Sequence, residues 1–291
     1  MKQAFNPKKL AISLFILLLI IECTENPFFD DTIKSQNRTI RGQIELNDRS
    51  TPDGVYIWFE GFDMGTYSDE KGNFQITLPA PANQAGEGVT GTYKLYYYLA
   101  NFQLDSSFIV IKNGEIQGLH GDLNSRRELK QSKYLIKILK IKTEIEPAIV
   151  TEDYRGAINI TLSLDPLIDS VFVKFPNKTE GPVAIVFLKK IFPEEDYFEI
   201  LDVNGFALSA SMVADSLTNV PKIWSAGFHL NADRLPKGQY QIIPYFLIEQ
   251  GPLPYNLLND FGININNPVQ DFINVPIKRE GGDFEIREIS E

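Results

Sequence analysis

The side chains that most often carry out catalysis or bind metal ions are scarce in this sequence. It contains two histidines, His120 and His229, and a single cysteine, Cys23. The two histidines are far apart, and neither has a second histidine or cysteine at the spacing of a zinc site. The sequence also lacks the Gly-x-Ser-x-Gly turn that presents the nucleophile of many hydrolases. We therefore predict no catalytic residue, no metal site and no cofactor.

Carboxylates are plentiful, and two of them suffice for glycoside hydrolysis when a rigid scaffold holds them at a defined separation. Glu194–Asp196 is an acidic cluster directly after Pro193, while Asp69, Glu70 and Asn73 share one turn. The first cluster is typical of a solvated loop, because carboxylates mostly lie at protein surfaces. The second lacks the alternating ligand spacing of an EF-hand loop and is typical of a hairpin turn. The sequence therefore predicts a protein that is not an enzyme.

An aromatic pair beside a carboxylate indicates binding rather than catalysis. Side chains two residues apart in a strand share one face, so Tyr56, Trp58 and Glu60 are predicted to lie together. Aromatic rings beside a carboxylate on an exposed sheet can stack on a sugar, and we take these three residues as a candidate ligand face. The alternative is that this face packs on the second half of the chain or on the segment Tyr96–Tyr98.

The start of the chain gives the single cysteine a context. The basic residues Lys2, Lys8 and Lys9 precede an almost unbroken apolar run from Leu10 to Ile21, and Cys23 follows. The run would be about 18 Å long as a helix, which is too short to cross a bilayer but within the range of a secretory signal.

This arrangement resembles a bacterial lipoprotein signal peptide, in which an aliphatic residue, here Ile20, stands three positions before a cysteine that is cleaved and lipidated. Glu22 departs from the small residue that this pattern has directly before the cysteine. The resemblance implies a signal peptide at 1–22, a lipid on Cys23 and a tether at 23–37. It also implies a protein of the bacterial cell envelope, lipid-anchored to the outer membrane. The other interpretation is an ordinary cysteine after a plain signal peptide.

The composition restricts the partners. With 28 Lys and Arg against 38 Asp and Glu, the chain has a formal net charge of −10 at pH 7. An acidic chain without a basic stripe has no electrostatic attraction to a phosphate backbone, so nucleic acid is predicted not to be a partner. The remaining candidates are the membrane, through the N-terminal lipid anchor, and envelope proteins or glycans.

The elements that must position these residues are predicted to be β-strands. Short alternating or β-branched segments follow one another from residue 38 onward, separated by turn residues. Gly72 is predicted to have a positive φ in the tight turn of one hairpin. The strands of the first half are expected within Arg38–Leu46, Val55–Glu60, Thr66–Pro79 (two strands), Gly91–Ala100 and Ser107–Lys112.

Three stretches of this half, Gly42–Leu46, Gly54–Gly61 and Thr66–Ile76, contain in order a glycine-led strand, a Gly-Val strand and an Asp-x-x-Gly-x-Phe hairpin. Together they resemble the carboxypeptidase regulatory-like domain, a transthyretin-like sandwich. The resemblance implies that alternate residues of Val55–Phe59 face the core, which leaves the candidate ligand face on the opposite side. It also implies a domain that accompanies catalytic or transport domains and is not itself an enzyme.

A second β unit is predicted from Tyr134, after a polar connection at Gly114–Lys133. Leu208–Leu217 predicts one short helix, and Gln250–Asn267 a long loop. The stretch Leu235–Tyr240 (LPKGQY) resembles the turn into a late strand of many immunoglobulin-like domains. The strands of this half are expected at Tyr134–Glu146, Ala157–Leu164, Ser170–Phe175, Gly181–Phe187, Trp224–Leu230, Lys237–Ile248 and Asp271–Lys278.

The predicted fold is all-β, with two tandem β-sandwich domains, transthyretin-like and then immunoglobulin-like, after a lipoprotein signal peptide. The predicted boundaries are 1–22 for the signal peptide, 23–37 for the tether, 38–130 for the regulatory-like sandwich and 131–291 for the immunoglobulin-like domain. The predicted function is that of a non-catalytic cell-envelope lipoprotein acting as a binding or scaffolding module at the bacterial surface or in the periplasm. The alternative is a carbohydrate-binding accessory protein or the remnant of a glycan-active hydrolase.

Overall fold

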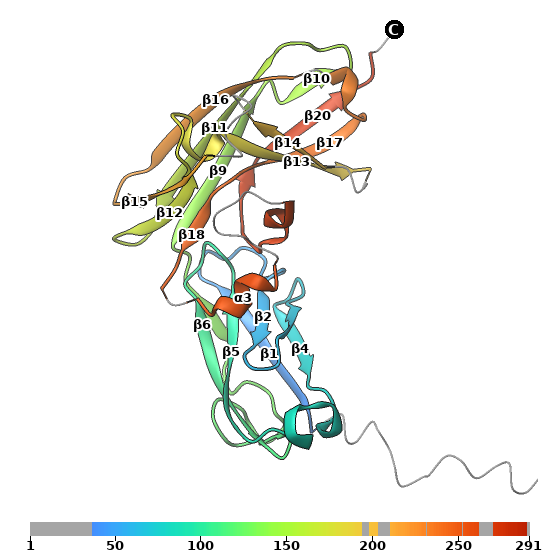
Figure 1. Cartoon of the computed structure of the whole chain (residues 1–291), viewed down its shortest axis with the longest axis vertical. Coiled ribbons are helices and arrows are strands. Elements are labelled where there is room, and N and C mark those ends of the chain that lie inside the picture. The colour runs from blue at the N-terminus through green and yellow to red at the C-terminus, as the bar shows by residue number, and fades with distance from the viewer. Residues whose placement is uncertain are drawn as a thin grey trace, which may run out of the picture.

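The computed structural model of the chain describes residues 37–193, 198–202, 210–230, 232–251, 253–261 and 270–289. These residues are mostly strands, arranged in two units that follow one another along the long axis of the molecule (Figure 1). The prediction of an all-β fold is thereby confirmed. Within the described residues, no helix has the length and apolar character needed to span a bilayer.

The first unit consists of two sheets. A three-stranded sheet has the strand order β4-β1-β8, and a five-stranded sheet has the order β3-β2-β5-β6-β7. Inward side chains of both sheets, such as Ile40, Phe74 and Tyr97, form one buried cluster between them. The strands are β1 (Thr39–Leu46), β2 (Tyr56–Phe59), β3 (Met64–Tyr67), β4 (Asn73–Thr77), β5 (Gly91–Tyr98), β6 (Asp105–Lys112), β7 (Glu115–Ile116) and β8 (Lys133–Leu135).

The tight turn between β3 and β4, which carries the chain from one sheet to the other, follows directly from its residues. The carboxylate of Asp69 accepts hydrogen bonds from the backbone N–H groups of Lys71 at 2.9 Å and Asn73 at 2.7 Å. Gly72 has a φ of +79°, and a Cβ at this position would overlap the carbonyl oxygen of Ile44. The tight turn and the positive φ of Gly72 confirm the predictions made for this segment, but the predicted hairpin is wrong, because β3 pairs with β2 in one sheet and β4 pairs with β1 in the other.

The second unit contains three sheets, with the strand orders β10-β20-β17-β13-β14, β16-β11-β9-β19 and β15-β12-β18. Every second side chain of β11 from Ile158 to Leu164 is buried, so this strand supplies one wall of a second hydrophobic core. The strands are β9 (Leu139–Glu146), β10 (Ile149–Thr151), β11 (Ala157–Pro166), β12 (Val171–Pro176), β13 (Ile185–Phe192), β14 (Phe198–Asp202), β15 (Met212–Leu217), β16 (Lys222–His229), β17 (Gly238–Pro244), β18 (Leu247–Glu249), β19 (Glu280–Gly281) and β20 (Asp283–Arg287).

Several predictions for the second half are corrected by the structure. Met212–Leu217 is a strand that pairs with β12, although a helix was predicted there, because strand pairing overrides the helix preference of its Met and Ala residues. Gln270–Asn274 forms a 3₁₀ turn, and 275–279 pair with no described strand, although a strand was predicted at Asp271–Lys278. The predicted long loop contains a short helix, α3 (Tyr255–Asn259). Further 3₁₀ turns lie at Pro81–Asn83, Ala85–Glu87, Gly181–Val183 and Ala232–Arg234.

The predicted connection at Gly114–Lys133 packs along the first unit rather than bridging the two units. The backbone N–H of Leu129 donates to the carbonyl of Arg41 at 2.9 Å, and that of Arg41 donates to the carbonyl of Arg127 at 3.3 Å. Strand β8 then pairs in parallel with β1. The chain therefore leaves the sheets of the first unit only after Leu135.

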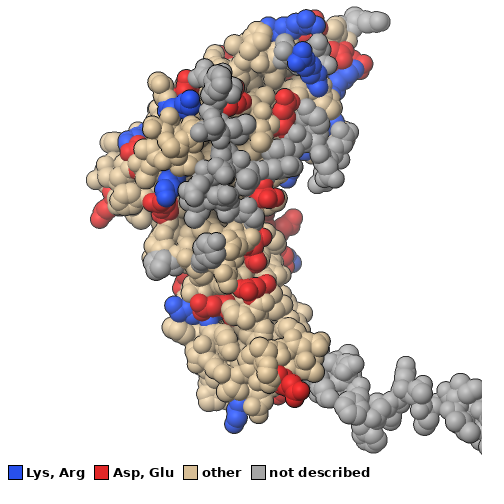
Figure 2. Space-filling model, in the orientation of Figure 1, with Lys and Arg blue, Asp and Glu red and all other residues tan. Residues whose placement is uncertain are grey.

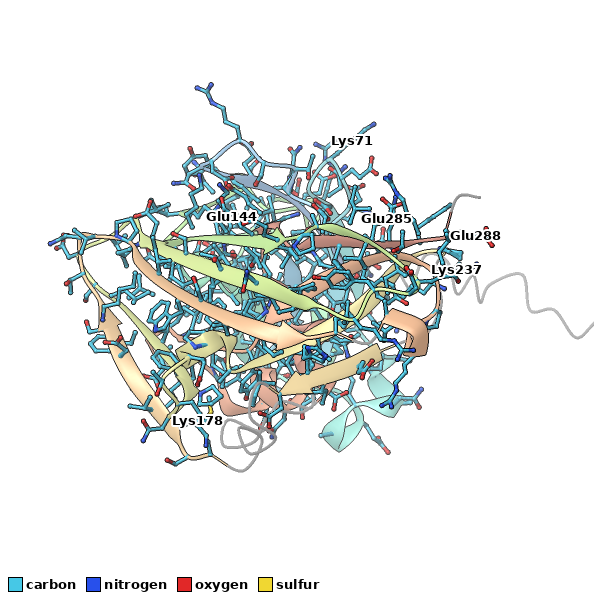
Figure 3. The ribbon with its side chains drawn as sticks, turned by 90° about the horizontal axis from the view of Figure 1, so that it is seen from above. Lys71, Glu144, Lys178, Lys237, Glu285 and Glu288 are labelled. Carbon is cyan, nitrogen blue, oxygen red and sulfur yellow. The ribbon has the colours of Figure 1, made fainter. Side chains whose placement is uncertain are left out.

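Charged side chains of both signs are interspersed on the face that Figure 2 shows, and the described residues of that face form no basic stripe. Many of these charges are paired at the surface. Lys237, for example, forms ion pairs with Glu288 at 2.7 Å and Glu152 at 3.1 Å, and Figure 3 shows Lys237 beside Glu288. Exposed pairs of this kind contribute little to stability.

Candidate functional site

Two of the residue sets singled out from the sequence lie outside the described residues. These are Cys23, the predicted lipidation site, and the acidic cluster Glu194–Asp196. The histidines are described, and they belong to different units: His120 follows β7, whereas His229 ends β16. Across the described residues, no three His, Cys, Asp or Glu side chains are grouped so that they could hold a metal ion.

The candidate ligand face lies on β2, an inner strand between β3 and β5. Tyr56 is opposite Tyr98 in the ladder, and Trp58 is opposite Tyr96, so four aromatic side chains meet on one patch of the sheet. Tyr56 is 8% exposed and Trp58 is 1% exposed, while Glu60 just beyond the strand is half-buried. The two rings belong to the hydrophobic cluster of the second unit rather than to the core of their own unit.

The second unit covers Tyr56 with the end of α3, which Figure 1 shows in orange where the two units meet. The ring of Phe261 packs edge-on against Tyr56 with centroids 4.8 Å apart, and it lies 5.9 Å from the ring of Tyr98. The hydroxyl of Tyr56 donates a hydrogen bond of 2.8 Å to the Asp260 carboxylate. Burial raises the pKa of Tyr56 above its ordinary value, and the hydrogen bond to Asp260 raises it further.

Trp58 is enclosed differently from Tyr56. Its ring lies 5.9 Å from that of Tyr96, and its indole N–H is buried without a hydrogen-bond partner. An unpaired buried donor is unfavourable, so the placement of Trp58 rests on the apolar surface that it removes from water. The alternative stated above, in which this face packs on the second half of the chain, is the arrangement found. Stacking on a sugar would require the two units to separate first.

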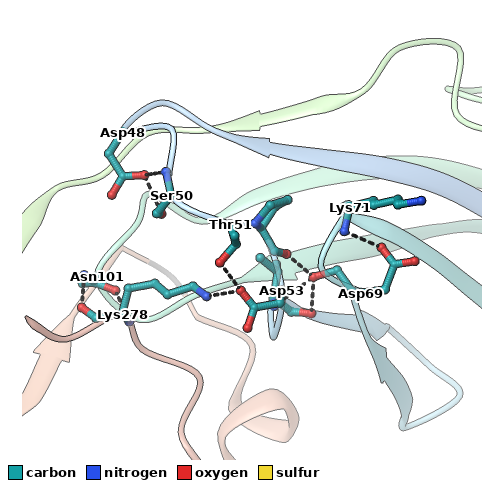
Figure 4. Close-up of polar contacts among 11 residues, drawn as sticks. Asp48, Ser50, Thr51, Asp53, Asp69, Lys71, Asn101 and Lys278 are labelled. Carbon is teal, nitrogen blue, oxygen red and sulfur yellow. Dashed lines mark hydrogen bonds and ion pairs between the residues drawn. The ribbon is translucent and has the colours of Figure 1, made fainter.

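Polar contacts also join the two units beside the aromatic patch, and Figure 4 shows those among Asn101, Lys278 and Asp53. Asn101 is fully buried, and its side chain donates to the carbonyl oxygens of Leu139 at 3.0 Å and Lys278 at 2.9 Å. The same side chain accepts a hydrogen bond from the backbone N–H of Lys278 at 3.0 Å. The ammonium of Lys278 reaches Asp53 at 2.6 Å. We call Asn101, Lys278 and Asp53 the polar junction.

A second side chain, Gln250, repeats this pattern on the adjoining segment. Its amide donates to the carbonyls of Ala100 at 2.7 Å and Phe102 at 2.6 Å, and its oxygen accepts from the backbone N–H of Leu104 at 2.8 Å. The backbone N–H of Ala100 donates to the carbonyl of Pro276 at 2.7 Å. Buried backbone groups of one unit are thus paired by side chains and backbone of the other, as buried polar groups require.

An apolar cavity of about 260 Å³ lies beside these contacts, lined by residues such as Tyr98, Leu258 and Phe272. This volume is below the range of roughly 300–1,000 Å³ that is typical of ligand sites. The cavity is therefore better explained as imperfect packing between the units than as a binding pocket.

Comparison with known proteins adds distant similarities. No protein-family model and no curated protein matches the chain. Among solved structures, the chain is similar to the Bacillus anthracis TIE protein, at 9% sequence identity and a TM-score of 0.22 over 85% of this chain and 34% of that chain. It is also similar to a variant of BcpA, the major pilin subunit of Bacillus cereus, at 8% identity and a TM-score of 0.26 over 73% of this chain and 66% of that chain.

The chain thus spans about a third of the length of the TIE protein and just under two thirds of that of the pilin subunit. TM-scores this low do not establish a shared fold. The assignments to the carboxypeptidase regulatory-like and immunoglobulin-like families stay predictions.

The residues that join the units could not be identified from the sequence. Asp260 and Gln250 lie in a segment that was predicted only as a loop, and Asn101 follows a predicted strand. The contacts between the units join residues that are far apart in the sequence. Gln250 and Leu104 are 146 positions apart, and Lys278 and Asp53 are 225 positions apart. No local spacing reports such a contact. The sequence offered one signal for this joint. The alternation in β2 placed two large aromatic side chains, Tyr56 and Trp58, on one face of the sheet, where exposure to water would be unfavourable.

Proposed function

We propose that the protein is a non-catalytic lipoprotein of the bacterial cell envelope, in which Cys23 carries the lipid and the two β units form a scaffolding module. The observation that carries the scaffolding part is the joint between the units. The aromatic face of β2, which offered the best candidate for ligand stacking, is occupied by Phe261 and Asp260 of the second unit.

The joint supports a scaffold because it combines two kinds of contact. Aromatic packing around Tyr56 removes apolar surface from water, and the hydrogen bonds of Asn101 and Gln250 fix the relative position of the backbones. A joint held only by a flexible linker would leave the two units free to turn. Side chains that satisfy buried backbone groups across the joint favour one arrangement instead.

The electrostatics of one pair of carboxyl groups argue against a general acid at the most evident candidate position. Asp69 and Glu128 line one concavity of the first unit, as a pair of hydrolytic carboxylates would. A general acid needs a raised pKa. Hydrogen bonds from Asn73 lower the pKa of Asp69, and a hydrogen bond from Asn124 lowers that of Glu128. Both groups are therefore held in the ionised form.

Metabolic labelling with a palmitate analogue tests the lipid anchor. We expect the full-length chain to be labelled and to remain with the membrane fraction, and the Cys23→Ser variant to lose both properties, because that variant lacks the thiol that would carry the lipid. Lys71→Gln, which changes an exposed turn residue of the first unit, serves as the matched control and should be labelled like the wild type. An unlabelled wild type, or a labelled Cys23→Ser chain, would contradict the proposal.

A further inference from the structure

A second cavity between the units differs from the apolar one in size and charge. Its volume is about 410 Å³, which is within the range of ligand sites. Three cationic residues, Lys189, Lys278 and Arg279, line it together with one carboxylate, Asp53. In a chain with a formal net charge of −10, this is a local excess of positive charge.

Two of the four charges are already paired. The ammonium of Lys278 and the carboxylate of Asp53 form the 2.6 Å ion pair of the polar junction. Thr51 donates a further hydrogen bond to the same oxygen of Asp53 at 2.7 Å. Asp53 is therefore engaged, and the cavity charges without an ion pair to a described residue are those of Lys189 on β13 and Arg279 on the segment before β19.

Arg279 is the exceptional member of this group. Its Nε and Nη2 atoms are buried without a hydrogen-bond partner, and no described carboxylate forms an ion pair with it. Among the described residues, its guanidinium carbon lies over the ring of Phe272, 5.5 Å from the ring centroid. Burial lowers the pKa of Arg279 to about 9, which is the electrostatic sign of the same missing partner.

Arg279 as a whole is half-buried, but two of its three guanidinium nitrogens are buried and unpaired. Buried donors of a cation are unfavourable without a partner, and in native proteins their usual counterpart is an ion, a water or a ligand. The planar guanidinium matches the geometry of an oxyanion, to which it can donate two parallel hydrogen bonds. Packing against the ring of Phe272, rather than a hydrogen bond to a described residue, holds the guanidinium in its present position.

The rest of the cavity wall fits this chemistry. Lys189 is exposed, so the cavity is reached from solvent at this residue, and its ammonium adds a second positive charge. Gln241 on β17 and Tyr67 on β3 also line the cavity and supply neutral donors. The neighbouring aliphatic residues Ile243, Val275 and Ile277 limit the water that can compete for the anion.

We propose that the cavity between the two β units is an oxyanion-binding site, in which Arg279 and Lys189 hold a phosphate or carboxylate group of a small ligand. The ligand contacts β13 of the second unit and the segment that follows the polar junction. This proposal is independent of the proposed function: the anion site could exist whether or not Cys23 carries a lipid and whether or not the protein is an enzyme.

Thermal unfolding of the full chain tests the proposal, with sodium phosphate or sodium succinate as probe and sodium chloride at equal ionic strength as reference. A ligand that binds only the folded state raises the melting temperature with the logarithm of its concentration. We expect such a rise for phosphate, for succinate or for both, and the comparison of the two identifies the group that the site prefers. Arg279→Met should abolish the rise, and Lys189→Gln should weaken the apparent affinity about tenfold, the equivalent of one charged hydrogen bond.

Two comparisons keep this test specific. Lys112→Gln removes an exposed lysine at the end of β6 and should leave the response to the anion unchanged. In chloride, Arg279→Met should melt at or above the temperature of the wild type, because it removes a buried unpaired charge.

The proposal is overturned if neither anion raises the melting temperature of the wild type above the chloride reference. It is also overturned if Arg279→Met or Lys189→Gln responds as fully as the wild type. Because Lys189 is exposed, Lys189→Gln is expected to fold. Its response to the anion therefore still tests the proposal if Arg279→Met fails to fold.

Discussion

Lys278 and Arg279 are neighbours in one segment, yet they meet opposite conditions. Lys278 has its backbone N–H on Asn101 and its ammonium on Asp53, so both of its donors are satisfied. Arg279 faces a cavity and has two buried nitrogens without a partner. The polar junction is complete within the chain, whereas the cavity that Lys278 and Asp53 also line is complete only with an anion. The first is built for stability and the second for binding.

This difference indicates which variants should weaken the fold and which should not. Substitutions at the polar junction leave buried groups unpaired and lower the free energy of unfolding. A substitution of Arg279 removes a group that is already unpaired.

Asn101→Ala should lower the free energy of unfolding by about 3 kcal/mol. The substitution leaves the carbonyl oxygens of Leu139 and Lys278 and the backbone N–H of Lys278 without their side-chain partner. Urea denaturation followed by circular dichroism measures the loss. Asn124→Ala is the matched control, because Asn124 bonds only within its own unit, and it should cost about 1 kcal/mol. Equal losses in the two variants would show that the polar junction has no special weight.

Tyr56→Phe should lower the free energy of unfolding by about 1.5 kcal/mol, because it removes the hydrogen bond to the Asp260 carboxylate and keeps the ring against Phe261. Tyr154→Phe, which loses a hydrogen bond from an exposed hydroxyl to a carbonyl within the second unit, should cost less than about 0.5 kcal/mol. Denaturation of the two variants side by side makes the comparison. A Tyr154 variant as destabilised as the Tyr56 variant would contradict the role of the joint.

The pH dependence gives this prediction a second readout. The pKa of Tyr56 is raised in the folded state above its ordinary value of 10.0. Its contribution to stability is therefore fully present below pH 10 and is lost progressively as the pH rises further, because the unfolded chain ionises first. The difference between the wild type and Tyr56→Phe should accordingly shrink above pH 10. A difference that stays constant there would mean that Tyr56 ionises alike in both states.

Features that are set by residues close together in the sequence could be predicted, whereas contacts between residues far apart in the sequence could not. Local patterns were sufficient for the strands and for the β3–β4 turn, because alternation and the positive φ of Gly72 are set by neighbouring residues. Local preference was misleading at Met212–Leu217, where pairing with β12 decides the conformation. The candidate face was placed correctly on β2, but its cover, Asp260 and Phe261, comes from a distant segment without a recognisable pattern. The lack of a partner for Arg279 could not be predicted either, because it depends on which side chains surround its guanidinium in the folded chain.

Asp53→Asn should have the smallest effect, about 0.5 kcal/mol at neutral pH, because the ion pair with Lys278 is partly exposed and screened by solvent. The hydrogen bond from Lys278 lowers the pKa of Asp53 below its ordinary value of 3.8. The contribution of the pair is therefore present above about pH 4 and is lost as the pH falls through the lowered pKa, because the unfolded chain takes up the proton first. The free energies of unfolding of the wild type and Asp53→Asn should converge below pH 4. Glu288→Gln, which breaks the exposed pair with Lys237 (Figure 3), is the control and should leave the stability at neutral pH unchanged. If Asp53→Asn also leaves it unchanged, the polar junction rests on Asn101 and its backbone partners, and the ammonium of Lys278 becomes a third cation available to the anion in the cavity.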